Sequence, residues 1–148
     1  MIGVLLNEEN VKGVSYHRLY VPFKNLQEKG YDVKFFENLS DLTDKELRDC
    51  RAVVISRGFV PKFGHQALRD ELHRQGILIV IDQDDHWSLD SWHPMIEVFE
   101  GQNKRQHIID SIIYSDFVTV THKKLSKKIS KLNKNARSVV IPNAIDAS

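Results

Sequence analysis

The stretch "IVIDQDDHW" (79–87) places three carboxylates and an imidazole directly after a run of apolar residues. Side chains alternate between the two faces of an extended chain, so Asp82 and Asp84 are expected to point one way and Asp85 the other. Asp82 and Asp84 together with His86 could hold a hard divalent cation through oxygen and imidazole ligands. General acid–base chemistry by His86 or an aspartate is a second interpretation. A third is a polar cluster that closes a buried strand and caps the segment that follows.

A second candidate for chemistry is the segment "NEENVKGVSYHR" (7–18), which joins an apolar run to a helical pattern. Gly13 could let the backbone approach an anion at the start of that helix, where free N–H groups favour negative charge. The segment holds a single glycine, so the GxGxxG fingerprint of dinucleotide binding is absent, and with it the case for NAD or FAD. A plain loop glycine remains the alternative.

Both segments must be positioned by the elements around them, and the apolar pattern predicts what these are. Runs without strict alternation suit strands that are covered on both faces, as in a parallel sheet. The expected strands are 2–6, 31–36, 52–56, 77–82, 117–121 and 138–141. Helical patterns separate them, which predicts an α/β fold with an open, doubly wound (Rossmann-like), mostly parallel sheet. Ligands of such sheets bind beyond the carboxyl ends of the strands.

The helix boundaries carry recognisable signals. The first helical pattern starts at Ser15, a candidate N-cap, and stops at Gly30. Pro22 lies inside this pattern and should kink the helix or mark an early start. A second helix is expected from Thr43, with Glu46 completing a capping box.

Composition limits the class of protein. A chain of 148 residues suits one domain, here residues 1–148, and 41% hydrophobic with 28% charged residues is typical of a soluble globular protein. The longest apolar run, 77–81, is far too short to span a bilayer. The start "MIGVLLNEEN" lacks the basic region of a signal peptide. A single cysteine, Cys50, excludes an internal disulfide and fits a reducing cytoplasm.

The charge is unevenly distributed. Of the 21 basic residues, seven lie between 117 and 145, where there is no acid, so the rest of the chain has 14 basic and 20 acidic residues. Leu125, Ile129 and Leu132 form an apolar seam in this basic helix, which is either a solvated surface helix or a surface attracted to anionic lipid. Nucleic acid is not expected because aromatic residues for base stacking are missing. The lysines concerned are Lys123, Lys124, Lys127, Lys128 and Lys131.

Several stretches resemble one known family. "SDFVTVTHKKLSKKI" followed by "ARSVVIPNAID" is similar to the end of the N-terminal domain of family 4 glycosyltransferases with the GT-B fold, although Ala144 replaces the usual glycine. "GVSYHRLYVPFKNLQEKGYDV" resembles a subgroup in which G-x-x-x-x-R-x-x-x-P opens the first helix. In that subgroup the fourth strand commonly ends in D-x-D-D-x-x-W/F, which "DQDDHW" nearly matches. The resemblance covers essentially the whole chain.

The resemblance implies a role for each candidate residue. Gly13 and Val14 would lie near the donor phosphates, with Arg18 supporting their loop. Asn143 would lie near the hinge between two domains. Asp82, Asp84, Asp85 and His86 would line the cleft, His86 contacting the transferred sugar or activating the acceptor hydroxyl. GT-B enzymes are generally metal-independent, so we expect no metal and no cofactor beyond the nucleotide-sugar donor.

The resemblance also implies a second, donor-binding domain that this chain lacks, because the chain stops at "PNAIDAS", where a linker is expected. We therefore expect residues 1–148 to fold, as a monomer or weak dimer, and to be inactive alone. The complete enzyme would be cytoplasmic, peripheral to the inner face of the membrane, and retaining. Two alternatives stay open: a metal-dependent hydrolase using Asp82, Asp84 and His86, and a non-catalytic doubly wound binding module.

Overall fold

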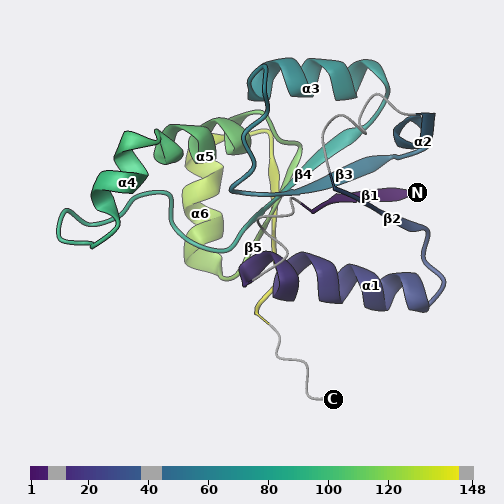
Figure 1. Cartoon of the computed structure of the whole chain (residues 1–148), viewed down its shortest axis with the longest axis horizontal. Helices are drawn as coiled ribbons and strands as arrows, with labels where there is room; N and C mark the ends of the chain where they lie inside the picture. The colour runs from purple at the N-terminus through teal and green to yellow at the C-terminus, as the bar shows by residue number, and fades with distance from the viewer. Residues whose placement is uncertain (7–12, 38–44, 144–148) are drawn as a thin grey trace.

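The protein is an α/β domain built on one six-stranded, all-parallel sheet, which confirms the predicted fold class (Figure 1). The computed structural model describes the chain except for residues 7–12, 38–44 and 144–148. The strand order is β2-β1-β3-β4-β5-β6. The strands are β1 (Ile2–Leu5), β2 (Val33–Phe36), β3 (Ala52–Ser56), β4 (Leu78–Gln83), β5 (Phe117–Val120) and β6 (Arg137–Val140).

Helices cover the sheet on both sides because the chain winds in two directions from β1. The first crossover leads outward to β2, and later ones lead from β3 toward β6, so the direction changes between β1 and β3. Helix α1 lies on one face, and α2 and α3 lie on the other (Figure 1). The helices are η2 (a π-helix, Tyr16–Tyr20), α1 (Val21–Glu28), α2 (Lys45–Arg48), α3 (His65–Arg74), α4 (Ile96–Gly101), α5 (Lys104–Ile113) and α6 (Lys123–Leu132).

The first helical segment differs in part from its prediction. A π-helical turn runs directly into α1, and Pro22 lies where the π-helical geometry gives way to the α-helix, so it marks a change of helix type instead of a start. Ser15 makes no capping bond to the backbone, since its hydroxyl lies 3.3 Å from that of Ser56. Gly30 has φ 88° and follows the end of α1, as expected of a helix stop. The capping box expected at Thr43 and Glu46 lies outside the residues whose side chains are described.

Apolar residues from both faces form the core. One cluster packs α2 and α3 on β1, β3 and β4, and a second packs η2 and α1 on the opposite face. A third joins Trp87 to α5, α6 and β5, and it includes Leu125 and Ile129 from the predicted seam of the basic helix. Leu132 packs against this cluster while half-buried. No helix in the described part of the chain has the length and apolar character needed to cross a membrane.

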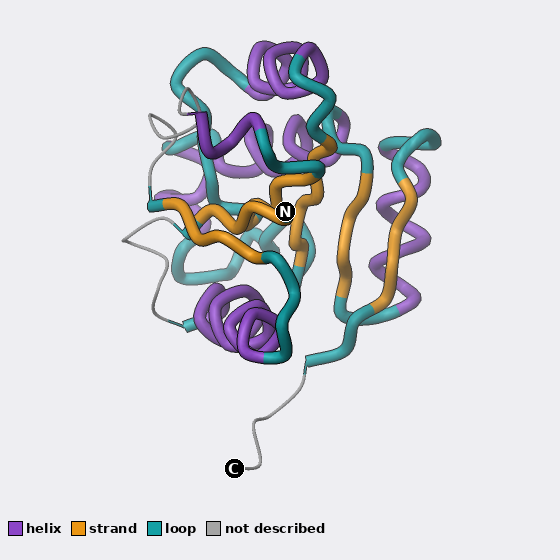
Figure 2. The backbone as a smooth tube through the Cα atoms, turned by 90° about the vertical axis from the view of Figure 1, so that its right-hand side faces the viewer, coloured by secondary structure: helices purple, strands orange, loops and turns teal. Residues whose placement is uncertain are grey.

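The last strand departs from the expectation that both faces are covered. Val139 and Val140 are 47% and 36% exposed, although parallel strands are ordinarily buried on both sides. The sheet twists strongly, so the last strands run steeply relative to the first ones (Figure 2). The twist carries the end of β6 toward η2 at the carboxyl edge of the sheet, where one hydrogen bond joins the two.

Candidate functional site

The carboxyl ends of parallel strands meet at one edge of the sheet, and a buried ion pair lies at the centre of that edge. Arg18, on η2, donates from Nε to Oδ2 of Asp82 at 2.8 Å and from Nη2 to Oδ1 at 2.7 Å. Thr119, on β5, donates its hydroxyl to the same Oδ1 at 2.6 Å. Both charged side chains are 7% exposed. This two-pronged geometry is the strongest form of a carboxylate–guanidinium contact.

The same guanidinium also binds the chain that follows β6. Its Nη1 donates to the carbonyl of Ile141 at 3.1 Å and to Oδ1 of Asn143 at 2.8 Å. The hydrogen bond with Asp82 raises the pKa of Arg18 above its already high ordinary value, so the group stays charged. Arg18 therefore ties together three segments that are far apart in sequence, and each of its side-chain nitrogens donates to the protein.

A second ion pair lies beside the first. Arg57 directly follows β3, and its Nε lies 2.8 Å from Oδ1 of Asp84. The hydroxyl of Thr121 donates to the carbonyl oxygen of Asp84 at 3.0 Å, which fixes the chain just after β4. Burial raises the pKa of the Asp84 carboxyl, and the nearby Arg57 guanidinium opposes that shift. The carboxylate is thus partly desolvated and held by one cation.

The two ion pairs bear on whether Asp82 and Asp84 could bind a metal ion. A divalent cation at Asp82 and Asp84 would have to displace Arg18 and Arg57, each bonded within 2.8 Å. Across residues 1–6, 13–37 and 45–143, no three His, Cys, Asp or Glu side chains are grouped to hold a metal ion. The donor set therefore suits guanidinium groups better than a metal ion.

His86 belongs to a separate arrangement just outside the ion pairs. Its Nδ1 accepts from the backbone N–H of Ser88 at 3.2 Å, and the Ser88 hydroxyl lies 2.7 Å from the same atom. The ring stacks on Trp87 with centroids 4.5 Å apart. The backbone N–H of His86 donates to Oδ1 of Asp85 at 2.8 Å, while Asp85 itself is exposed. Burial, and then the charge of Lys128, lower the pKa of His86, which favours the neutral ring at pH 7.

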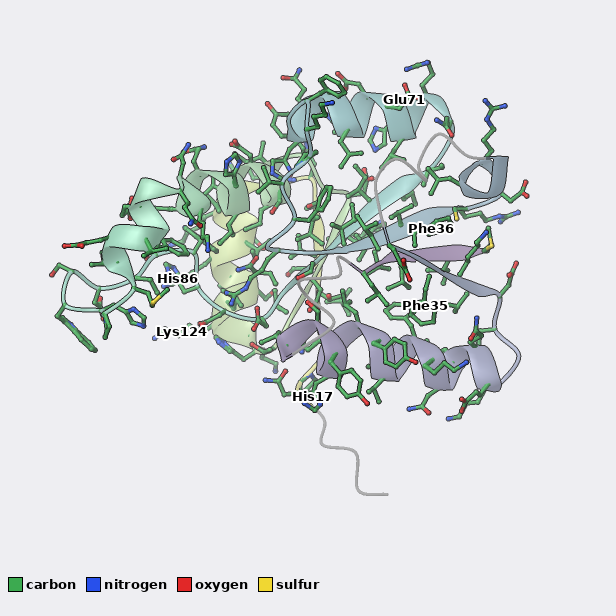
Figure 3. All side chains as sticks on the ribbon, viewed as in Figure 1. His17, Phe35, Phe36, Glu71, His86 and Lys124 are labelled. Atoms are coloured by element: carbon green, nitrogen blue, oxygen red, sulfur yellow. The ribbon has the colours of Figure 1, made fainter. Side chains whose placement is uncertain are left out.

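The hydrogen bonds fix which nitrogen of that neutral ring can react. A nitrogen that accepts from a backbone N–H carries no hydrogen, so the neutral ring of His86 has its hydrogen on Nε2. Nε2 is then a hydrogen-bond donor, and it cannot remove a proton from a substrate. Figure 3 shows His86 between helix α4, with the loop that leads to it, and helix α6.

The predicted phosphate-binding residues lie at the start of η2. Gly13 has φ 76°, a left-handed conformation that favours glycine, and its carbonyl accepts from the backbone N–H of His17 at 3.3 Å. Val14 is exposed. The structure thus joins Arg18, Asp82 and Asn143 in one bonded network and places His86 with Asp85 in another.

Two residues that complete the site were not singled out from the sequence. Arg57 binds Asp84, and Thr119 binds Asp82. Each lies at the carboxyl end of a strand that neighbours β4, so the order of the strands was the missing information.

Comparisons with protein-family models and with curated proteins find no match to this chain. The residues and their geometry therefore carry any inference about activity. They comprise a locked ion-pair network at the edge of the sheet and an oriented imidazole beside it.

Proposed function

We propose that the chain is the N-terminal, acceptor-side domain of a glycosyltransferase that moves a sugar from a nucleotide-sugar donor to a glycan or lipid-linked acceptor. The observation that carries this proposal is the network around Arg18. Arg18, Asp82 and Asn143 come from the three separate stretches in which the chain resembles family 4 glycosyltransferases. Their hydrogen bonds support the resemblance because they meet at the edge where doubly wound sheets bind ligands.

The geometry divides the work between the residues. Arg18 and Asp82 hold η2 against the sheet and so position Gly13 and Val14, whose backbone would face the donor phosphates. His86 would donate a hydrogen bond from Nε2 to an oxygen of the transferred sugar. Such groups accelerate transfer by positioning the reactants and by stabilising charge in the transition state.

A general-base role for His86, which the sequence left open, is not favoured by the position of its ring hydrogen. The hydrolase alternative likewise gains no support, since Asp82 and Asp84 are both bound to arginine. The donor-binding domain would be supplied by further sequence.

We also propose a weak contact between α6 and an anionic membrane surface. Its apolar residues Leu125 and Ile129 are buried in the core, so the exposed lysines would act through charge alone. The exposed ones are Lys123, Lys124, Lys127 and Lys131.

The test of the main proposal is glycosyl transfer by the protein encoded by the complete reading frame. A mixture of nucleotide-sugars would be supplied together with glycan and lipid extracts, and nucleoside diphosphate release and the product mass would be measured. We expect transfer of the sugar. The substitution His86→Ala should reduce it, and the substitution His93→Ala, in the loop before α4, should not. Manganese-dependent hydrolysis without transfer would instead establish the hydrolase.

A further inference from the structure

We propose that His86, Arg105 and Lys128 form a binding site for a phosphate-like oxyanion, and that this site receives an anionic group of the acceptor. The identification of the ligand as the acceptor rests on the proposed function. The binding of the anion does not, and it can be measured without turnover.

The first element of the site is an oriented donor. Two contacts from Ser88 hold Nδ1 of His86, and stacking on Trp87 fixes the plane of the ring. Trp87 is itself buried in the cluster formed with α5 and α6. Nε2–H of the half-buried His86 is therefore held in one direction before any ligand arrives, which reduces the entropy lost on binding.

The second element is a pair of cations on the two helices, α5 and α6, that pack against Trp87. Trp87 packs in one cluster with Ile108 of α5 and Leu125 of α6. Arg105 precedes Ile108 by three positions, and Lys128 follows Leu125 by three, so each shares a helix face with a residue of that cluster. Both cations are close enough to His86 to lower its pKa, after the larger effect of burial.

The charges around His86 favour an anion over a neutral sugar. Lys128 and Arg105 act on the ring from α6 and α5, and Asp85 acts on it from its own loop. Among the residues that the structure describes, no carboxylate forms an ion pair with Arg105 or Lys128. Two cations and one N–H donor suit a tetrahedral oxyanion such as a phosphate monoester or diphosphate.

Binding should report on the imidazole directly. An anion beside the ring stabilises the imidazolium, so the pKa of His86 rises from its lowered value when the site fills. Asp85 already acts in that direction, whereas Lys128 and Arg105 act against it until the anion screens them.

The experiment is NMR of the histidine ring nitrogens in the intact chain, titrated with inorganic phosphate, with glucose 1-phosphate, and with phosphatidylcholine vesicles with or without phosphatidic acid. The free protein should show Nδ1 bare and Nε2 protonated in His86. We expect saturable phosphate binding that raises the pKa of this ring. Each hydrogen bond to a charged group is worth roughly a tenfold change in Kd, so Arg105→Gln with Lys128→Gln should weaken binding roughly a hundredfold.

The matched control is Lys104→Gln with Lys134→Gln, which removes the same charge at exposed positions on α5 and just after α6. Equal weakening by both double variants would reduce the effect to general charge and overturn the proposal. A hydrogen on Nδ1 in the free protein would overturn it as well. A response to glucose 1-phosphate assigns the anion to a soluble acceptor, and a response confined to phosphatidic acid vesicles assigns it to a lipid. Phosphate binding without turnover would count against the proposed function alone.

Discussion

The stretch "DQDDHW" contains two regions that the structure treats in opposite ways. At its start, Asp82 is almost fully buried and bonded to Arg18 and Thr119. At its end, His86 is half-buried, is held from one side by Ser88, and keeps Nε2 as a donor. Only three residues therefore lie between a group that holds the fold together and a group that is free to meet a ligand.

This contrast indicates which polar residues at the carboxyl edge of the sheet are available for chemistry. A carboxylate that is desolvated and bonded to a guanidinium is too costly to release, because breaking the pair strands a buried charge. A side chain that is held only by its own loop, such as His86, can bind or release a ligand without disturbing the sheet. Substitutions of Arg18, the partner of Asp82, and of His86 test this contrast.

The largest effect is expected from Arg18→Met, which leaves Asp82 buried without its cation. Removing one partner of a buried ion pair costs about 3–5 kcal/mol in the free energy of unfolding. Urea unfolding followed by circular dichroism measures it. The double variant Arg18→Met with Asp82→Asn should recover part of the loss, since no charge is left unpaired. A loss below about 1 kcal/mol would show that the pair does not hold the fold as described.

At the other end, His86→Ala should lower turnover of the complete enzyme and leave the fold nearly as stable. Loss of one positioned donor costs about 2–4 kcal/mol of transition-state stabilisation, or roughly a hundredfold or more in kcat. The free energy of unfolding of residues 1–148 should change by less than about 1 kcal/mol, because His86 lies outside the apolar core. Near-normal kcat with a Tm several degrees lower would reverse the assignment and make His86 structural.

Asp84 is less buried than Asp82 and is paired with Arg57, so its effect on stability is expected to depend on pH. Burial raises the pKa of this carboxyl in the folded protein above its unfolded value, so the folded state holds the proton more tightly. Its contribution to stability is therefore favourable at low pH and is lost as the pH rises through the unfolded and then the folded pKa.

Asp84→Asn mimics the protonated group, so its stability relative to the wild type should increase from pH 3 to pH 6. Urea unfolding at a series of pH values tests this, with Asp90→Asn as an exposed control. A relative stability that falls over the same range would mean that the pair with Arg57 outweighs burial.

The smallest effect concerns charge that faces solvent. Lysines near anionic lipid contribute about 1 kcal/mol each, and the attraction decays within a Debye length of roughly 10 Å in 0.1 M salt. Binding of the chain to phosphatidylserine vesicles should therefore be weak and salt-sensitive, and Lys124→Glu with Lys127→Glu should abolish it in a sedimentation assay. Equal binding to neutral vesicles, or none to anionic ones at low salt, would leave α6 as a solvated helix.

Much of the fold could be predicted because local signals agree with the global structure. The first five apolar runs form strands that are largely buried in a parallel sheet, 138–141 forms a more exposed edge strand, and Gly30 ends its helix with φ 88°. The π-helical turn that carries Arg18 has no such signal. Its geometry depends on contacts with β4 and the end of β6, which come later in the chain.

The site could be predicted in its location but less well in its chemistry. The end of β4 was expected to face a ligand, and the bonded network does lie at that edge. The sequence indicates a metal site at Asp82 and Asp84 because it shows that these acids are close together. It does not show which basic side chains pair with them in the folded protein. Arg18 and Arg57 become their partners only through the order of the strands.

The hydrogen bonds of Arg18 to distant segments also determine when, during synthesis of the chain, these contacts can form. Arg18 leaves the ribosome 64 residues ahead of Asp82, which at about 5–20 residues per second is roughly 3–13 s. Asn143 follows Arg18 by 125 residues, or roughly 6–25 s at that speed. During that interval the nascent chain carries its first helical segment without the hydrogen bonds from Arg18 to Asp82 and Asn143. The guanidinium of Arg18, although made early, can gain its full set of partners only when nearly the whole domain has been synthesised.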